Sequence, residues 1–384
     1  MSATVDELHV PAPADYHVHV RQGAMSALIA PHVSAGGFQL AYVMPNTLPP
    51  ISSTEQALQY QADLQRIAPQ TQWIMTLYLS PALTPEEIRQ ASKAGVRGVK
   101  SYPRGVTTNS DGGIEDYEAY YPVFEAMEQE NMVLNLHGEV PSDADKGICV
   151  LNAEAAFLSH LHKLHARFPK LRIVLEHATT AAAVEAVQGC SETVACTITA
   201  HHLALTVDDW AGRPINFCKP VAKYPSDREA LRRVIKEGHP RFFLGSDSAP
   251  HPFASKLPSA TTHGSVPAAA QSACAAGVYT SAILLPLCAT LLESFGALDK
   301  LNGFVSTNGR RFYGDALGKN TAAPGETQPA KDVVVLRRVK SEGEEGKVPG
   351  AYVLEGHQDM QDSDKEKVSV VPFWAGKQLG WAIV

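Results

Sequence analysis

Eight short apolar segments alternate with helical segments over the first two thirds of the chain, and this alternation limits the possible folds more than any other feature. Most of these segments are apolar throughout, which is typical of strands that are buried on both faces of a parallel sheet. The predicted strands are residues 14–21, 38–44, 73–79, 96–101, 132–136, 171–176, 193–199 and 241–245. Eight alternations within about 240 residues predict an α/β fold, a (β/α)8 TIM barrel.

The helices between these strands carry start signals. Thr84 with Glu87 has the spacing of a capping box, and Ser226 with Glu229 is predicted to cap a helix that ends at Lys236. An open, doubly wound sheet is the structural alternative. It is less favoured because no glycine-rich phosphate loop follows the first strand.

The remainder of the chain is predicted to pack on the same domain. Helices over about 268–301 are expected to cover the barrel, and no linker separates them from the tail. The short strands expected in the tail are residues 332–338, 351–354 and 368–373. We therefore expect a single domain, with a barrel core at about 12–314 and a small C-terminal β extension at about 315–384.

Composition and charge exclude several classes of protein. Apolar residues make up 45% and charged residues 19% of the chain, and the net charge of −7 gives no basic surface for nucleic acid or an anionic membrane. We see no signal peptide, and the longest apolar run, 282–292, is interrupted by Pro286 and is too short to span a bilayer. The six cysteines show no CxxC spacing, so we expect reduced thiols and a cytoplasmic protein.

Polar residues gather where the predicted strands end. His17 and His19 are two positions apart, so a strand directs both to one side. The polar residues at or just after the strand ends are His17, His19, Asn46, Lys100, His137, His177 and Asp247. The C-terminal ends of the strands form the active face of such barrels, and histidine is the commonest metal ligand. The alternative, histidines that only hydrogen-bond to neighbouring backbone, must explain each residue separately.

Several strings of residues carry a resemblance to a known family. They are Asp-Tyr-His-Val-His-Val-Arg at 15–21, Met-Pro-Asn-Thr at 44–47, Lys-Ser-Tyr-Pro at 100–103, Thr-Thr-Asn-Ser at 107–110, Leu-His-Gly-Glu at 136–139, Gly-Ser-Asp-Ser-Ala-Pro-His at 245–251 and Val-Pro-Phe-Trp-Ala-Gly at 371–376. Together they resemble the amidohydrolase superfamily, and within it the short, single-function dihydroorotases of bacteria and fungi. The resemblance covers nearly the whole chain except an insertion around 340–357.

The resemblance implies a site with two zinc ions. One ion would be held by His17, His19 and Asp247, and the other by His137 and His177. Lys100, carbamylated on its amine to N6-carboxylysine, would bridge the two ions, and Asp247 would also be the catalytic acid–base. The residues implied in substrate binding are Arg21, Asn46 and His251 at the substrate carboxylate, Thr107 and Thr108 in a mobile lid, and, more weakly, Lys219 and Ala276 through their backbone.

The resemblance also implies the reaction, which is the reversible interconversion of dihydroorotate and N-carbamoyl-L-aspartate in pyrimidine (UMP) biosynthesis, and a homodimer. Hydantoinases and allantoinases share the metal ligands but have no particular need for Arg21 and Asn46. Non-catalytic scaffolds of the same fold typically lose ligands, whereas all six expected ligands are present here. His201 and His202 receive no role as metal ligands and are expected to be structural or supporting.

Overall fold

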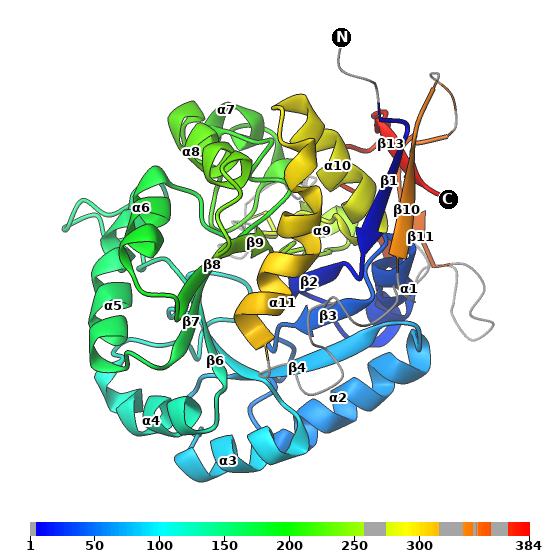
Figure 1. Ribbon diagram of the computed structural model, residues 1–384. Helices are drawn as coiled ribbons and strands as arrows, with labels where there is room; N and C mark the ends of the chain where they lie inside the picture. Colours follow the sequence, from blue (N-terminus) through cyan, green and yellow to red (C-terminus); the bar gives the residue numbers. More distant parts are fainter. Residues whose placement is uncertain (1–4, 257–273, 315–332, 341–342, 344, 355–367) are drawn as a thin grey trace, which may run out of the picture.

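Eight parallel strands form a barrel at the centre of the molecule, and helices surround it (Figure 1). The computed structural model describes residues 5–256, 274–314, 333–340, 343, 345–354 and 368–384. The strands lie in sequence order: β2 (Ala14–Val18), β3 (Leu40–Val43), β4 (Gln72–Tyr78), β5 (Gly98–Ser101), β6 (Val133–His137), β7 (Arg172–Glu176), β8 (Val194–Ile198) and β9 (Phe242–Leu244). The predicted TIM barrel is therefore confirmed.

The barrel closes between the last strand and the first, at a seam formed by the residues that follow β9. The backbone N–H of Asp247 donates to the carbonyl of His17 at 2.8 Å, and that of His19 donates to the carbonyl of Ser248 at 3.1 Å. Val18 and Ser248 form a parallel bridge between these two hydrogen bonds. The end of β2 and the turn after β9 are consequently held side by side.

Helices cover the outside of the barrel. They are α1 (Gly23–Ala35), α2 (Thr54–Ile67), α3 (Pro85–Ala94), α4 (Tyr121–Gln129), α5 (Ala153–Arg167), α6 (Ala181–Gly189), α7 (Val207–Trp210), α8 (Pro225–Lys236), α9 (Phe253–Lys256), α10 (Leu284–Ser294) and α11 (Asn308–Tyr313). Part of the predicted helical stretch 268–301 lies outside the described residues. Within the described part, residues 274–280 are not helical, and helical structure begins at Ser281.

Two helix starts differ from the prediction. The Thr84 hydroxyl accepts a hydrogen bond from the Glu87 N–H at 3.2 Å, but the Glu87 carboxylate accepts from the Thr54 hydroxyl of α2 at 2.7 Å instead of completing the box. The cap predicted from Ser226 is wrong, because α8 already begins at Pro225. A proline at the first helical turn needs no N–H partner, so it can start a helix without such a cap.

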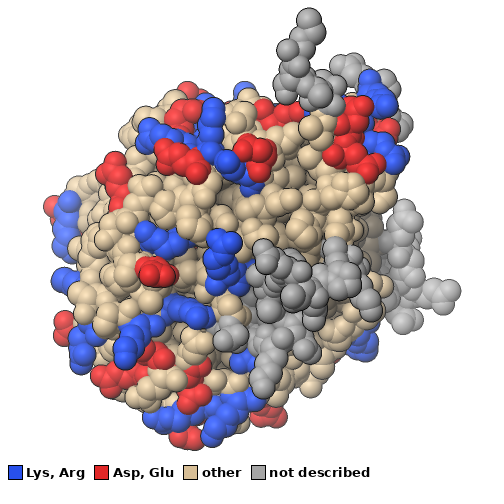
Figure 2. Space-filling view, in the orientation of Figure 1, with Lys and Arg blue, Asp and Glu red and all other residues tan. Residues whose placement is uncertain are grey.

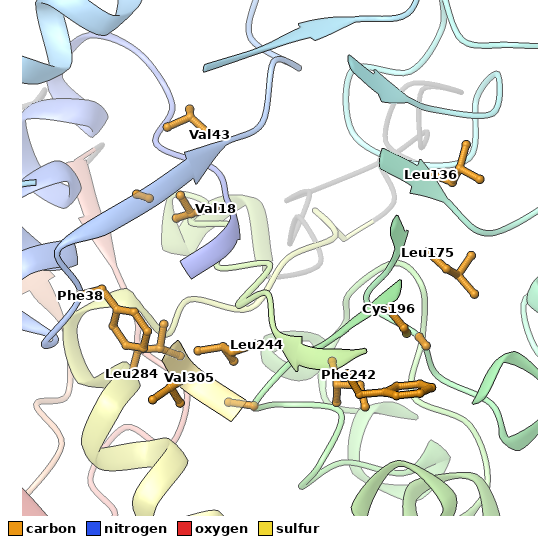
Figure 3. Packing of buried hydrophobic residues seen from close by; sticks show 14 of the residues in the cluster. Val18, Phe38, Val43, Leu136, Leu175, Cys196, Phe242, Leu244, Leu284 and Val305 are labelled. Atoms are coloured by element: carbon orange, nitrogen blue, oxygen red, sulfur yellow. The ribbon is translucent and has the colours of Figure 1, made fainter. Parts of the chain in front are cut away.

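The core has two layers separated by the barrel wall. Alternate strand residues project outward against the helices, and Figure 3 shows Val18, Val43, Leu136, Leu175 and Leu244 among them. The other residues fill the barrel interior: Ala14, Tyr16, Leu40, Tyr42, Met44, Ile74, Val133, Val174, Ala195, Phe243 and Tyr313. Because a Cβ at Gly98 would lie 1.8 Å from the Tyr42 hydroxyl, glycine is required at that point of β5.

The tail forms small sheets beside the barrel. The order β1 (Glu7–Pro11), β10 (Val333–Arg338), β13 (Trp381–Ile383) brings together segments from both ends of the chain, and β11 (Tyr352–Val353) pairs with β12 (Ser369–Val370) (Figure 1). The tail strands β10, β11 and β12 were predicted, whereas β1 and β13 were missed. Trp381 is buried and donates to the Glu293 carboxylate of α10 at 3.0 Å, so α10 holds this sheet against the barrel.

On the face seen in Figure 2, positively and negatively charged side chains are interspersed. This mixture fits the modest net charge of −7. Within the described ranges, no helix has the length and apolar character needed to cross a membrane.

Candidate metal centre and active site

Four buried histidines meet at the C-terminal ends of the barrel strands. The ring centroids of His17 and His19 are 5.3 Å apart, those of His17 and His177 5.0 Å, and those of His137 and His177 4.7 Å. The Asp247 carboxylate oxygen Oδ1 lies 3.0 Å from Nε2 of His19 and 3.5 Å from Nε2 of His17. Donor atoms of His17, His19 and Asp247 all lie within 4.8 Å of one another. These five predicted residues therefore form one continuous cluster.

The backbone turns sharply to direct these side chains into the mouth of the barrel. His177 has a φ of 41°, Asp247 of 44° and Arg21 of 58°, values that side-chain-bearing residues seldom adopt. All three follow directly after a strand or close to its end. Backbone strain of this kind is characteristic of functional sites, where the surrounding structure holds the residue in place.

Three of the four histidines are held by a second polar side chain. Nδ1 of His17 lies 2.7 Å from the Glu176 carboxylate, and Nε2 of His137 lies 2.9 Å from the Glu139 carboxylate. Nδ1 of His19 lies 2.8 Å from Oδ1 of Asn46, so the residue expected to bind substrate also orients a histidine. In each of these three rings the other nitrogen remains available as a metal ligand. This is the usual arrangement around metal-binding histidines.

Sequence reasoning missed Glu139 and Glu176, although both are fully buried. Burial alone would raise the pKa of Glu176, but the charges of His17 and Lys100 and its hydrogen bonds outweigh burial, so its pKa lies below the usual value. The available signal was an acidic residue beside a histidine at the end of an apolar strand. A buried carboxylate needs a partner, and here the adjacent cluster provides it.

Lys100 lies at the base of the cluster and is completely buried. Its Nζ has no hydrogen-bond partner among the described residues. Burial lowers the pKa of Lys100 to about 8, although the charges of Glu176 and Asp247 act in the opposite direction. An ammonium without a partner in the interior is costly, so the site is suited to a lysine that does not remain a free cation.

Asp247 is held in its charged form. Burial alone would raise its pKa, but the hydrogen bond from His19 and the charges of His17 and His19 lower the pKa well below that of an ordinary aspartate. Asp247 is thus a carboxylate at neutral pH. The cluster offers imidazole nitrogens and carboxylate oxygens, the donor set that zinc and related divalent ions prefer, so the residues present fit a metal.

Arg21 stands beside the cluster with its guanidinium fixed. Its Nε donates to the carbonyl of Pro250 at 2.9 Å. Nε2 of His251 donates to the carbonyl of Ala276 at 2.9 Å and lies 3.2 Å from the Arg21 guanidinium. A cavity of about 250 Å³ opens on this side. Its lining includes His19, Arg21, Asn46, Thr47 and Asn109. The structure therefore brings Arg21, Asn46, His251 and Ala276 to one edge of the cluster.

A loop between β5 and α4 reaches over this cavity. Asn46 donates through Nδ2 to the carbonyl of Thr108 at 3.1 Å, and Asn109 donates through its amide to the carbonyl of Asn46 at 2.9 Å. Thr107 is tied to Ser110 within the loop. Lys219 is half-buried and is not among the described residues that line the cavity.

Comparison with known proteins was made for the whole chain. The model of the amidohydrolase family matches residues 52–253. A dihydroorotase of Mycosarcoma maydis is 61% identical and covers 99% of this chain and 99% of its own length, and a dihydroorotase of Saccharomyces cerevisiae is 42% identical and covers 99% and 98%. The crystal structure of dihydroorotase from Saccharomyces cerevisiae in complex with 5-fluoroorotic acid matches with a TM-score of 0.84 at 41% identity, covering 99% of both chains.

These relatives extend over the full length of the chain and share both its fold and more than a third of its residues. Their names do not favour the hydantoinase, allantoinase or scaffold alternatives. The resemblance seen in the short strings around His17, Asn46, His137 and Asp247 therefore holds for the protein as a whole. The chain belongs to the dihydroorotase family of amidohydrolases.

Proposed function

We propose that this protein is a dihydroorotase that uses two zinc ions to interconvert dihydroorotate and N-carbamoyl-L-aspartate in pyrimidine biosynthesis. The reaction opens or closes a cyclic amide. The observation that carries the proposal is that a buried His–Asp cluster and a fixed guanidinium, Arg21, share one mouth of the barrel. The first suits hydrolysis assisted by metal ions, and the second suits an anionic substrate.

In this proposal His17, His19 and Asp247 would hold one ion, and His137 and His177 would hold the other. Lys100 would be carbamylated and would supply oxygen ligands to both ions. Because burial lowers the pKa of Lys100 to about 8, a larger fraction of the amine is neutral at pH 7 than in an exposed lysine, and only the neutral amine can react with carbon dioxide. Carbamylation would make the otherwise unpartnered Lys100 Nζ part of a metal-binding group.

The bound ions would supply an activated water molecule and a polarised ring carbonyl. Asp247 takes up the proton that the attacking water loses during ring opening and passes it to the leaving ring nitrogen. Its lowered pKa keeps it ionised before this transfer. Glu176 and Glu139 keep His17 and His137 in the required orientation.

Arg21, Asn46 and His251 bind the substrate carboxylate, and Lys219 and Ala276 offer backbone groups. An arginine can grip a carboxylate through two parallel hydrogen bonds. The relative from Saccharomyces cerevisiae was solved with 5-fluoroorotic acid, itself a ring that bears a carboxylic acid, at 41% identity to this chain. Thr107 and Thr108 belong to a lid that closes over the substrate and excludes water.

The cellular location and the oligomeric state are also proposals. We propose a cytoplasmic homodimer, as the resemblance implies. All six cysteines are free in the structure, as a reducing compartment would leave them.

A turnover assay tests the proposed function. The purified, metal-replete protein is given dihydroorotate, hydantoin and allantoin in parallel, and N-carbamoyl-L-aspartate is given for the reverse reaction. We expect conversion of dihydroorotate and N-carbamoyl-L-aspartate far above that of the two neutral rings. Faster turnover of hydantoin or allantoin would contradict the proposal.

A further inference from the structure

A second group of side chains that could bind a metal lies close to the proposed catalytic donors but shares no residue with them. It consists of His201 and His202, which follow β8, and Cys218, which lies in the segment leading to α8. All three are buried, with exposed fractions of 0%, 2% and 1%. One donor atom from each lies within 4.8 Å of the other two. We propose that His201, His202 and Cys218 bind one further divalent ion of the zinc type, in addition to the ions of the catalytic site.

The distances fit such an ion. Zinc is usually bound by four donors in a tetrahedron, with bonds of about 2.0–2.3 Å, so neighbouring donor atoms lie about 3.3–3.8 Å apart. Sγ of Cys218 is 3.7 Å from Nε2 of His202. The carbonyl oxygen of Pro220 lies 3.0 Å from that nitrogen and 3.3 Å from the sulfur, at hydrogen-bond distances, and it would have to move by a few tenths of an ångström to act as a fourth donor.

His201 supplies the second, independent observation. Its ring is completely buried, yet neither Nδ1 nor Nε2 has a hydrogen-bond partner among the described residues. Its ring centroid is 4.4 Å from that of His202. A buried polar group without a partner costs free energy, and an ion shared with His202 and Cys218 would remove this cost.

His202 is already oriented for this role. Its Nδ1 lies 2.9 Å from the Thr199 hydroxyl, which also accepts from the His202 backbone N–H at 2.9 Å. When Nε2 binds an ion, the ring proton sits on Nδ1 and donates to Thr199, as second partners of metal-binding histidines commonly require. The bond from Nε2 to the Pro220 carbonyl is then replaced by two bonds to the ion.

Binding exchanges a proton for the metal. The Cys218 S–H bond breaks, a bond from sulfur to the ion forms, and the proton leaves to solvent. Burial raises the pKa of the Cys218 thiol to about 12, so without an ion the thiol stays protonated. The charges that act on it are of both signs: Asp247 and Glu139 are negative, and Lys256 and Lys223 are positive.

Cobalt(II) is the probe, because a thiolate bound to cobalt gives a charge-transfer band in the near ultraviolet. The proposed catalytic donors are nitrogen and oxygen atoms only, so this band reports Cys218 whether or not the protein turns over dihydroorotate. The full-length protein is stripped with a chelator and reloaded with cobalt(II). We expect the band in the unaltered protein and in Cys149→Ser, which removes the exposed cysteine, and we expect its loss in Cys218→Ser.

Zinc content provides a second measurement on protein purified without added chelator. Cys218→Ser and His201→Gln are each expected to lower it by about one ion per chain relative to Cys149→Ser. His201→Gln keeps a polar side chain of similar size, so it serves if Cys218→Ser does not fold. The absence of a thiolate band from the unaltered protein, its persistence in Cys218→Ser, or an unchanged zinc content in a folded His201→Gln protein would overturn the proposal.

Discussion

At the scale of single residues, three of the four cluster histidines are oriented by a second polar side chain. Glu176 accepts from His17 and is itself held by Asn135 at 2.6 Å and Thr197 at 2.5 Å. A carboxylate with this many partners is rigid, so it can fix the ring of His17. The affinity of the cluster for a metal would therefore depend partly on residues that do not contact the metal.

Glu176→Gln tests this dependence. Losing the charge behind His17 should weaken metal binding about 10- to 100-fold, measured by chelator competition followed by elemental analysis. Glu185→Gln is the matched control, because Glu185 is an exposed carboxylate on α6. Equal affinities in the two variants would show that Glu176 does not support the cluster.

Arg21→Met tests the carboxylate clamp. Losing a charge-assisted pair in a largely dry site should lower kcat/KM for dihydroorotate about 30-fold to several thousand-fold, while metal content stays unchanged. Arg66→Met is the control, since the Arg66 side chain is 75% exposed. Normal kinetics in Arg21→Met, or loss of its metal, would contradict the assignment of Arg21.

The residues that line the cluster were predictable because they end predicted strands. His17 and His19 lie two positions apart, and their rings do lie side by side, although β2 has an irregularity between Asp15 and Val18. Glu139 lies only two residues from His137, a local signal that was overlooked. Glu176 was not found, because it meets His17 only across the closed barrel. Asn46 was expected only at the substrate, and its bond to His19 likewise appears only in three dimensions.

At the scale of elements, the loop between β5 and α4 is held to the mouth by two hydrogen bonds through Asn46. One is made by its side chain to Thr108, and the other by Asn109 to its carbonyl. Asn109 has a φ of 56°, a conformation that asparagine and glycine tolerate better than other residues. Asn46 thus contacts both a cluster histidine and the loop.

Asn109→Gly tests the role of the Asn109 side-chain amide without changing the backbone conformation at this position. Glycine keeps the positive φ and removes the donor, so one hydrogen bond worth about 0.5–1.5 kcal/mol is lost. We expect faster hydrogen exchange over residues 103–113 and a kcat/KM lowered about 2- to 12-fold, with metal content unchanged. The double change of Thr107 and Thr108 to glycine should act in the same direction. If neither variant alters exchange or turnover, the loop does not gate the reaction.

Element positions were predicted within a few residues wherever a local signal existed. The strand predicted at residues 132–136, for example, corresponds to β6 at Val133–His137. By contrast, β1 and β13 were missed because each is short and pairs as a strand only with β10, which is remote from β1 in sequence. The partner of Glu87 was missed for the same reason, because Thr54 lies on another helix.

At the scale of the whole molecule, the small sheet of β1, β10 and β13 is attached to the barrel through α10. The Arg338 guanidinium lies 4.5 Å from the centre of the Trp381 ring and pairs with Glu293 at 2.7 Å. Glu293 also accepts from the Trp381 indole. These contacts favour a tail that unfolds together with the barrel.

Trp381→Ala measures the strength of this attachment. Removing a fully buried indole should lower the free energy of unfolding by about 3–5 kcal/mol, read from denaturant melts. Ile383→Ala, at a side chain that is 37% exposed on the same strand, should cost much less. The unaltered protein should unfold in one transition. Two separated transitions would mean that the tail and the barrel are independent units.

The seam between β2 and β9 also bears on the order in which the molecule is completed. His17 and His19 are translated early, whereas Asp247 is translated only after all the barrel strands. The three donors meet only when the segment after β9 reaches β2. A nascent chain therefore cannot assemble this donor set until the ring of strands is finished. An ion bound there would cross-link two distant points of the chain, much as a disulfide does, and would restrict the unfolded ensemble over most of the barrel. Capture of the ion would then mark the end of folding.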